Sequence, residues 1–189
     1  MKRNFYMKHL YILLSLFIFF SGVGSSMAYE EPSFALVQAN EAYEIRYYEE
    51  RIVVQTRNTN QNSGFRKLFN YISGKNSNSE KIAMTVPVTQ TDNLMQFYLP
   101  IKFDLENTPI PIDGDVKIST IPGGYYAVIK YGGRSSDSNF LKHAKFLRGA
   151  LSNDGIEILS EPIKATYNGP FTPSFLRRNE ALLLIKWSS

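Results

Sequence analysis

Residues 43 to 57 alternate between apolar and polar positions over short distances, which is typical of half-buried strands. The stretch reads Y-E-I-R-Y-Y-E-E-R-I-V-V-Q-T-R. Tyr43, Ile45 and Tyr47, at odd-numbered positions, share one side of the strand. From Ile52 onwards the residues that share one side, Ile52, Val54 and Thr56, are at even-numbered positions. Because this parity changes near Glu49 and Glu50, we expect a strand with a bulge or bend there.

A helical period follows the polar loop N-T-N-Q-N-S. Apolar residues recur at i, i+3, i+4 and i+7, which predicts a short amphipathic helix whose apolar stripe packs on a sheet. The expected stripe consists of Phe65, Leu68, Phe69 and Ile72. Asn62 or Ser63 is the expected N-cap, and Gly74 the C-terminal stop. Lys67 and Tyr71, four residues apart, are expected on the flank of the stripe.

The segment E-K-I-A-M-T-V-P-V-T-Q at residues 80 to 90 predicts another strand. Its apolar side holds Ile82, Met84, Val86 and Val88. Pro87 cannot donate to a ladder, so its part of the strand is expected at an edge, a strand end or a bulge. A second apolar strand, L-M-Q-F-Y-L-P, comes next, and residues 102 to 114 predict a long surface crossing because they contain two prolines.

The second half of the chain repeats this plan. A strand at residues 125 to 131 precedes a helix opened by Ser135, Ser136 or Asp137 and ended by N-D-G at residues 153 to 155. The period of this helix is carried by Phe140, Ala144, Leu147 and Leu151. Strands are expected at 156–158, 163–168 and 181–187. The order strand, helix, strand, strand therefore occurs twice, which predicts an α+β fold with two similar halves and two main helices.

The first 28 residues have the pattern of a secretory signal peptide. Three basic residues precede an apolar run from Leu10 to Phe20, and S-M-A at residues 26 to 28 resembles a cleavage site. We expect cleavage after Ala28, which leaves 189 − 28 = 161 residues, a suitable length for a single domain at 29–189. The apolar run is shorter than the roughly 20 residues of a membrane helix, so a retained anchor is the alternative. The expected location is secreted or periplasmic, with no stable membrane span after cleavage.

Composition excludes several classes of function. The signal holds three basic residues and no acidic ones, so the formal charge falls from +4 to +4 − 3 = +1, which gives no reason to expect nucleic acid as a partner. Cysteine is absent and His143 is the only imidazole after the signal, which excludes thiol chemistry and zinc sites built on several such ligands. The chain contains no G-x-S-x-G, H-E-x-x-H or G-x-G-x-x-G motif, so no enzyme is predicted.

Three segments together resemble the SOUL family of haem-binding proteins. They are Y-E-I-R-Y-Y-E from Tyr43, K-I-A-M-T-V-P-V from Lys81, and Y-N-G-P-F-T-P-S-F-L-R-R-N-E from Tyr167. The likeness covers about residues 34 to 187. It implies a twisted, mostly antiparallel, barrel-like sheet of two similar halves, and non-covalent binding of a tetrapyrrole, chiefly haem. It places the haem in a shallow apolar groove near the first helix, beside the M-T-x-P-V segment and the loop before R-R-N-E.

A haem site needs an apolar floor for the disc and cations at the rim for its two carboxylates. With the resemblance as guide, the candidate binding residues are Arg66, Lys67, Tyr71, Lys81, Met84, Phe171, Phe175 and Arg177. The residues alone also allow a plainer interpretation, in which Met84 is ordinary core and the lysines form a solvated face. In R-R-N-E, we expect at least one arginine to bridge a carboxylate and hold the C-terminal loop.

Axial ligation of the iron has three candidates. Some SOUL members carry a histidine directly after Y-E-I-R, but this chain has Tyr47 there, so histidine ligation through that position is excluded. Tyr47 is either a tyrosinate ligand or a packed strand aromatic. His143 is either a ligand or a histidine satisfied at the border of its helix's apolar stripe. Met84 offers a thioether, which ligates haem in cytochromes c.

The sequence thus predicts a non-enzymatic carrier or buffer of haem or porphyrin outside the cytoplasm. The alternative is a general small-molecule or partner-binding module on the same scaffold, without physiological haem binding. The sequence predicts no particular protein partner.

Overall fold

The computed structural model describes residues 29–57 and 61–188, and the predicted signal with its cleavage site lies outside them. The described strands are β1 (Ala35–Ala39), β2 (Glu44–Tyr48), β3 (Arg51–Arg57), β4 (Val88–Gln90), β5 (Leu94–Tyr98), β6 (Lys117–Ile121), β7 (Gly124–Tyr131), β8 (Ile163–Thr166) and β9 (Asn179–Ile185). The helices are α2 (Gln61–Ile72), α3 (Asp137–Asn153) and the short 3₁₀ helix η1 (Ser174–Leu176).

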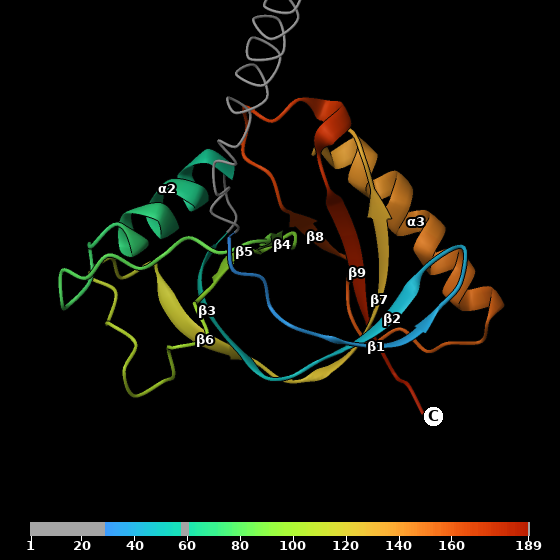
Figure 1. The fold of residues 1–189 in the computed structure, drawn as a ribbon, viewed down its shortest axis with the longest axis horizontal. Coiled ribbons are helices and arrows are strands. Elements are labelled where there is room, and N and C mark those ends of the chain that lie inside the picture. Colours follow the sequence, from blue (N-terminus) through green and yellow to red (C-terminus); the bar gives the residue numbers. More distant parts are fainter. Residues whose placement is uncertain (1–28, 58–60, 189) are drawn as a thin grey trace, which may run out of the picture.

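All nine strands form one sheet in the order β1-β2-β7-β9-β8-β4-β5-β3-β6. Every pair of neighbours is antiparallel. The sheet curls into a half-barrel with α2 beside one half and α3 beside the other (Figure 1). The predicted fold, an α+β protein with a barrel-like, mostly antiparallel sheet and two main helices, is confirmed.

Strand alternation gives the sheet two different faces. One face packs under the helices, with Leu68 of α2 against Val54 and Phe97, and Leu147 of α3 against Ile45 and Leu183. All six side chains are at most 1% exposed. The opposite face lines the inside of the curl and carries tyrosines and charged residues. Burial of one such leucine contributes about 1.5–3 kcal/mol. Since the helix-covered face buries several side chains of this size, it supplies the main hydrophobic core.

The expected break in the first strand and most expected helix ends are confirmed. Glu49 and Glu50 separate β2 from β3, where the parity changes. Ser136 is the N-cap of α3, and its hydroxyl accepts a hydrogen bond from the Asn139 N–H at 3.3 Å. Gly74 follows α2 with φ of +110°, a conformation in which glycine ends helices at little cost. The predicted N-cap of α2 was wrong, because the helix already begins at Gln61 and contains both Asn62 and Ser63.

Three expectations about strands were wrong. Residues 80–87 are not a regular strand, and β4 begins only at Val88, directly after Pro87. Residues 156–158 make only an isolated bridge, between Ile158 and Ile185. β1 and β6 were missed. Both are sheet edges, β1 is exposed throughout and β6 has no fully buried residue, so neither shows a buried apolar side that alternates with a polar one.

Candidate functional site

The predicted site residues on α2 lie on different sides of the helix. Arg66 is exposed, and Lys67 is half-buried with its Nζ 2.5 Å from Asp115 Oδ2. This hydrogen bond raises the pKa of Lys67. Tyr71 is 1% exposed and belongs to the core rather than the flank, which corrects the sequence expectation. Its hydroxyl donates to the Pro109 carbonyl at 2.8 Å, and burial raises the pKa of Tyr71 to about 12.

Lys67 and Tyr71 line a pocket of about 180 Å³ between α2 and the loop before β6. The other lining residues are Asn70, Lys75, Pro111, Ile112, Asp113 and Val116. Pockets that enclose a cofactor measure roughly 300–1,000 Å³. This one therefore has room for the edge of a large flat ligand and not for its whole disc.

An aromatic pair faces solvent on α2. Phe65 and Phe69, which were predicted to be buried, are 41% and 48% exposed. Their rings are nearly parallel, with an interplanar angle of 13° and centroids 6.0 Å apart, and Phe65 also lies 5.2 Å from the Phe97 ring. The core-facing stripe of α2 is instead Leu68, Tyr71 and Ile72. These three residues also have the i, i+3, i+4 spacing. That spacing could have predicted that their side of α2 faces the core.

The segment before β4 lies against the same core as α2. The Ile82 N–H donates to the Ile72 carbonyl at 2.8 Å, and Met84 is half-buried against the core cluster that contains Leu68. Lys81 is exposed. The structure therefore associates Met84 with α2, as expected, and leaves the Lys81 ammonium in solvent.

The predicted residues of the C-terminal loop form a second group. Phe171 and Phe175 are 98% and 81% exposed. Arg177 is half-buried, and its guanidinium donates to the carbonyls of Thr172 at 2.7 Å and Pro170 at 2.5 Å. Since those bonds fold the loop on itself, Arg177 has a structural role, and its role at the rim of a haem site stays a prediction.

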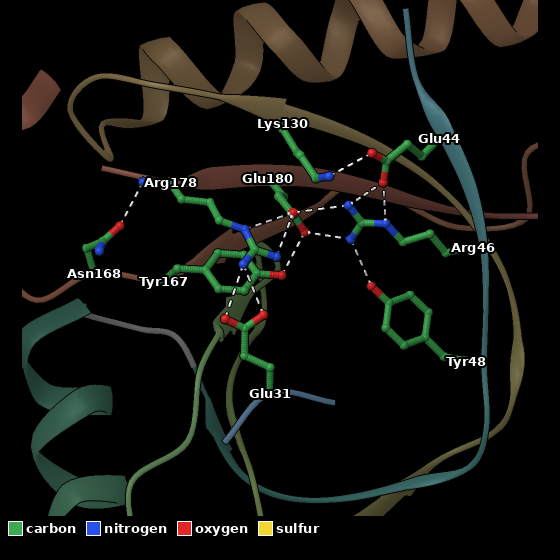
Figure 2. A network of polar contacts seen from close by, with 9 residues as sticks. All are labelled: Glu31, Glu44, Arg46, Tyr48, Lys130, Tyr167, Asn168, Arg178 and Glu180. Carbon is green, nitrogen blue, oxygen red and sulfur yellow. Dashed lines mark hydrogen bonds and ion pairs between the residues drawn. The ribbon is translucent and has the colours of Figure 1, made fainter. Parts of the chain in front are cut away.

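A buried network of charged side chains connects this loop to the rest of the site (Figure 2). Arg46, which is fully buried, donates to both oxygens of Glu180 at 3.0 and 3.2 Å. Tyr167 donates to Glu180 at 2.7 Å, and Arg178 donates to Glu180 at 3.1 and 3.2 Å. Arg178 also holds Glu31 with two bonds of 3.0 and 3.1 Å. The expected structural role of one arginine in R-R-N-E is thus confirmed for Arg178.

The electrostatics of this network shift the pKa values of Arg46 and Tyr167 upward. Burial lowers the pKa of Arg46, but the hydrogen bond and charge of Glu180 raise it by more, so the net shift is upward. Burial, followed by the charge of Glu180, raises the pKa of Tyr167 far above its usual value. Arg46 was not selected from the sequence, because the partner that gives it meaning lies 134 residues away.

The N-terminal residues join the two groups of predicted site residues. The Val86 N–H donates to the Glu30 carbonyl at 2.9 Å, next to Met84, and the neighbouring Glu31 pairs with Arg178. The side of the molecule that carries Met84 is thereby tied to the loop that carries Phe171 and Phe175.

Two of the three candidate axial ligands, His143 and Tyr47, pack against other aromatic side chains. His143 Nδ1 lies 2.7 Å from the Asn139 carbonyl oxygen, and its ring stacks on Tyr131 with centroids 4.2 Å apart. Tyr47 packs against Tyr125, with centroids 5.0 Å apart. Within residues 29–57 and 61–188, no cluster of three or more His, Cys, Asp or Glu side chains is arranged to hold a metal ion. The same part of the chain contains no helix that is long and apolar enough to cross a membrane.

A family model described as "SOUL heme-binding protein" matches residues 29–184. Heme-binding protein 2 of Homo sapiens is 29% identical over 164 residues, which cover 77% of this chain and 78% of that protein. Heme-binding protein 1 of Mus musculus is 29% identical over 129 residues, which cover 62% of this chain and 67% of that protein.

Solved structures share the fold at much lower identity. The EcmrR C-terminal domain superposes with a TM-score of 0.54 at 14% identity, covering 76% of this chain and 98% of that one. A hydrolase from Listeria innocua superposes with a TM-score of 0.55 at 10% identity, covering 79% and 94%. At such identities the likeness shows the architecture and not the chemistry.

Proposed function

Because the chain belongs to the SOUL heme-binding protein family, we propose that it binds haem or a related porphyrin non-covalently on the surface beside α2. The observation that supports this surface most is the exposed, nearly parallel pair Phe65 and Phe69. Aromatic side chains of this size are usually buried, and an exposed pair is typical of a binding surface.

The chemistry of this surface suits a porphyrin. The rings offer a flat apolar floor, and the exposed fractions of Phe65 and Phe69 together leave roughly 180 Å² to be covered. Covering that area contributes about 4.5 kcal/mol. Arg66, exposed between the two rings in sequence, and the exposed Lys81 supply cations for the two carboxylates, whereas Lys67 is already paired with Asp115.

Phe171 and Phe175 extend the proposed surface. They are the two most exposed phenylalanines of the described residues. Their loop is tied through Arg178 and Glu31 to the segment next to Met84. We therefore assign them as a second apolar wall for the same ligand.

We infer that the porphyrin is held by its face and edges rather than through the iron. The only histidine in 29–188 is His143, which lies on α3 and stacks on Tyr131. A bound haem would supply its own iron chemistry, and the residues beside α2 would supply apolar cover and charge. Metal-free protoporphyrin IX should then bind within about threefold of the affinity of haemin.

A Soret titration of the purified protein with haemin tests the proposal. We expect a saturable band shift at micromolar haemin, weakened at least tenfold by Phe65→Ala combined with Phe69→Ala. Phe146→Ala on α3, which removes a 56% exposed phenylalanine elsewhere, is the matched control and should leave the titration unchanged. A flat titration of the unsubstituted protein would contradict haem binding and favour a general small-molecule or partner-binding module.

We also propose that the protein is an exported carrier or buffer and not an enzyme. The support is the signal pattern of residues 1–28 and the lack of a recognised catalytic motif. Export predicts that protein recovered from the periplasm or the medium begins at Tyr29, which N-terminal sequencing measures. Recovery of the chain with residues 1–28 still attached would contradict cleavage.

A further inference from the structure

The concave side of the sheet holds an arginine enclosed by tyrosines. Arg51, the first residue of β3, lies with its guanidinium carbon 4.5 Å from the ring centroid of Tyr48, 5.2 Å from that of Tyr126 and 5.6 Å from that of Tyr98. These rings belong to three different strands, so only the curl of the sheet brings them together. Aromatic faces stabilise a cation electrostatically, and they leave its N–H groups free to donate.

One edge of the Arg51 guanidinium has no hydrogen-bond partner among the described residues. Its Nε and Nη2 atoms are buried, yet neither donates to an oxygen of residues 29–57 or 61–188. These two atoms form one side of the planar guanidinium, and their parallel N–H groups match the two oxygens of a carboxylate. Leaving such donors buried and unpaired is costly, so a partner for this edge is expected.

The charge of Arg51 is also unbalanced. The neighbouring network contains three cations, Arg46, Lys130 and Arg178, and these pair with three carboxylates, Glu31, Glu44 and Glu180. Within the described part of the chain, no ion pair reaches Arg51. The space enclosed by Tyr48, Tyr98 and Tyr126, called the chamber below, therefore carries one uncompensated positive charge.

We propose that this chamber is a second ligand site, which binds the carboxylate group of a small molecule with a flat apolar body. The carboxylate pairs with the Nε and Nη2 edge of Arg51. The body lies among the apolar and aromatic lining residues, which are Pro32, Phe34, Tyr48, Pro87, Tyr98, Tyr167 and Leu182. This site lies on the concave face of the sheet, opposite the helix-covered face that carries α2.

Binding requires the N-terminal residues to move. The space in the chamber is about 10 Å³, which corresponds to roughly one water molecule. Glu31, Pro32 and Phe34 line the chamber, and Glu31 and Phe34 are exposed. The ion pair between Glu31 and Arg178 holds this segment in place, and both side chains are partly exposed. Breaking an ion pair of this kind costs little free energy, and it would let the segment move away so that a ligand can enter the chamber.

An NMR titration with benzoate, using benzamide as its uncharged analogue, tests the site in the unsubstituted protein. We expect benzoate to shift the ring signals of Tyr48, Tyr98 and Tyr126 in a saturable manner, and benzamide to shift them at least tenfold more weakly. Equal responses to the two compounds, or no saturable response to benzoate, would overturn the proposal. This comparison needs no substitution and does not depend on how a variant folds.

Variants then identify the cation. Arg51→Met should weaken benzoate at least tenfold, whereas Arg57→Met, at the exposed end of the same strand, should leave binding unchanged. Glu31→Gln should tighten benzoate about two- to fivefold, because it loosens the segment that covers the chamber. Retained affinity in Arg51→Met, or weaker binding in Glu31→Gln, would refute the assigned cation or the assigned opening respectively. A haemin titration of Arg51→Met should match the unsubstituted protein, which separates this site from the one proposed beside α2.

Discussion

Replacement of Arg46 by Met tests how much the buried network stabilises the fold. The Arg46 and Glu180 side chains are both fully buried and meet through two hydrogen bonds. Removing one partner of a buried ion pair typically costs 3–5 kcal/mol, because the remaining charge stays buried. Here Glu180 keeps Arg178 and Tyr167 as partners, which lowers the expected loss to about 3 kcal/mol.

Urea unfolding followed by circular dichroism measures this loss as a change in the free energy of unfolding. Lys186→Met is the control, because its pair with Glu157 is 71% and 60% exposed and should contribute less than about 0.5 kcal/mol. Methionine has a volume close to that of arginine, so cavity formation adds little to the effect. If Arg46→Met lowers the free energy of unfolding by less than about 1 kcal/mol, the Arg46–Glu180 pair does not stabilise the packing of β2 and β9 as expected.

Two further predictions concern single side chains. The pKa of Tyr71 is raised from 10.0 to about 12, first by burial, so the stability that its neutral form contributes is complete below pH 10 and is lost as the pH rises to 12. Tyr71→Phe should reduce this alkaline loss by about 1–2 kcal/mol in urea titrations at pH 9 and pH 12, and an unchanged difference would contradict the assignment. Ser136→Ala removes the N-cap bond of α3 and should cost about 1 kcal/mol, whereas Ser152→Ala near the helix end should cost almost nothing; equal losses in thermal unfolding would refute the capping role.

The elements that the sequence predicted well are those in which a local pattern and burial agree. α3 was correct from its Ser136 cap to its end, because its apolar period coincides with the face that packs on β7 and β9. α2 was predicted with the wrong orientation, because Phe65 and Phe69 are as apolar as Leu68 and Ile72. Two overlapping stripes satisfy the helical period equally well, and only the positions of β3 and β5 decide which of them is covered.

The segment E-K-I-A-M-T-V-P-V-T-Q shows the same limit on a strand. Its alternation predicted one buried side, but Thr85 and Thr89 are as buried as Val86 and Val88. Glu30 bridges to Thr85, whose hydroxyl also donates to the Tyr98 carbonyl at 2.6 Å, so both sides of the segment are covered. Alternation reports burial only where one side of a strand meets water.

The sequence alone determined the family, the α+β class, the two helices and the candidate residues around α2, because these depend on short motifs and on local periodicity. Only the tertiary structure decided which aromatic rings face solvent, which arginine is paired and which is free. Arg46 and Arg51 lie five residues apart and look alike in the chain. One meets the Glu180 carboxylate and the other meets three tyrosine rings, because the curl of the sheet places different strands opposite them.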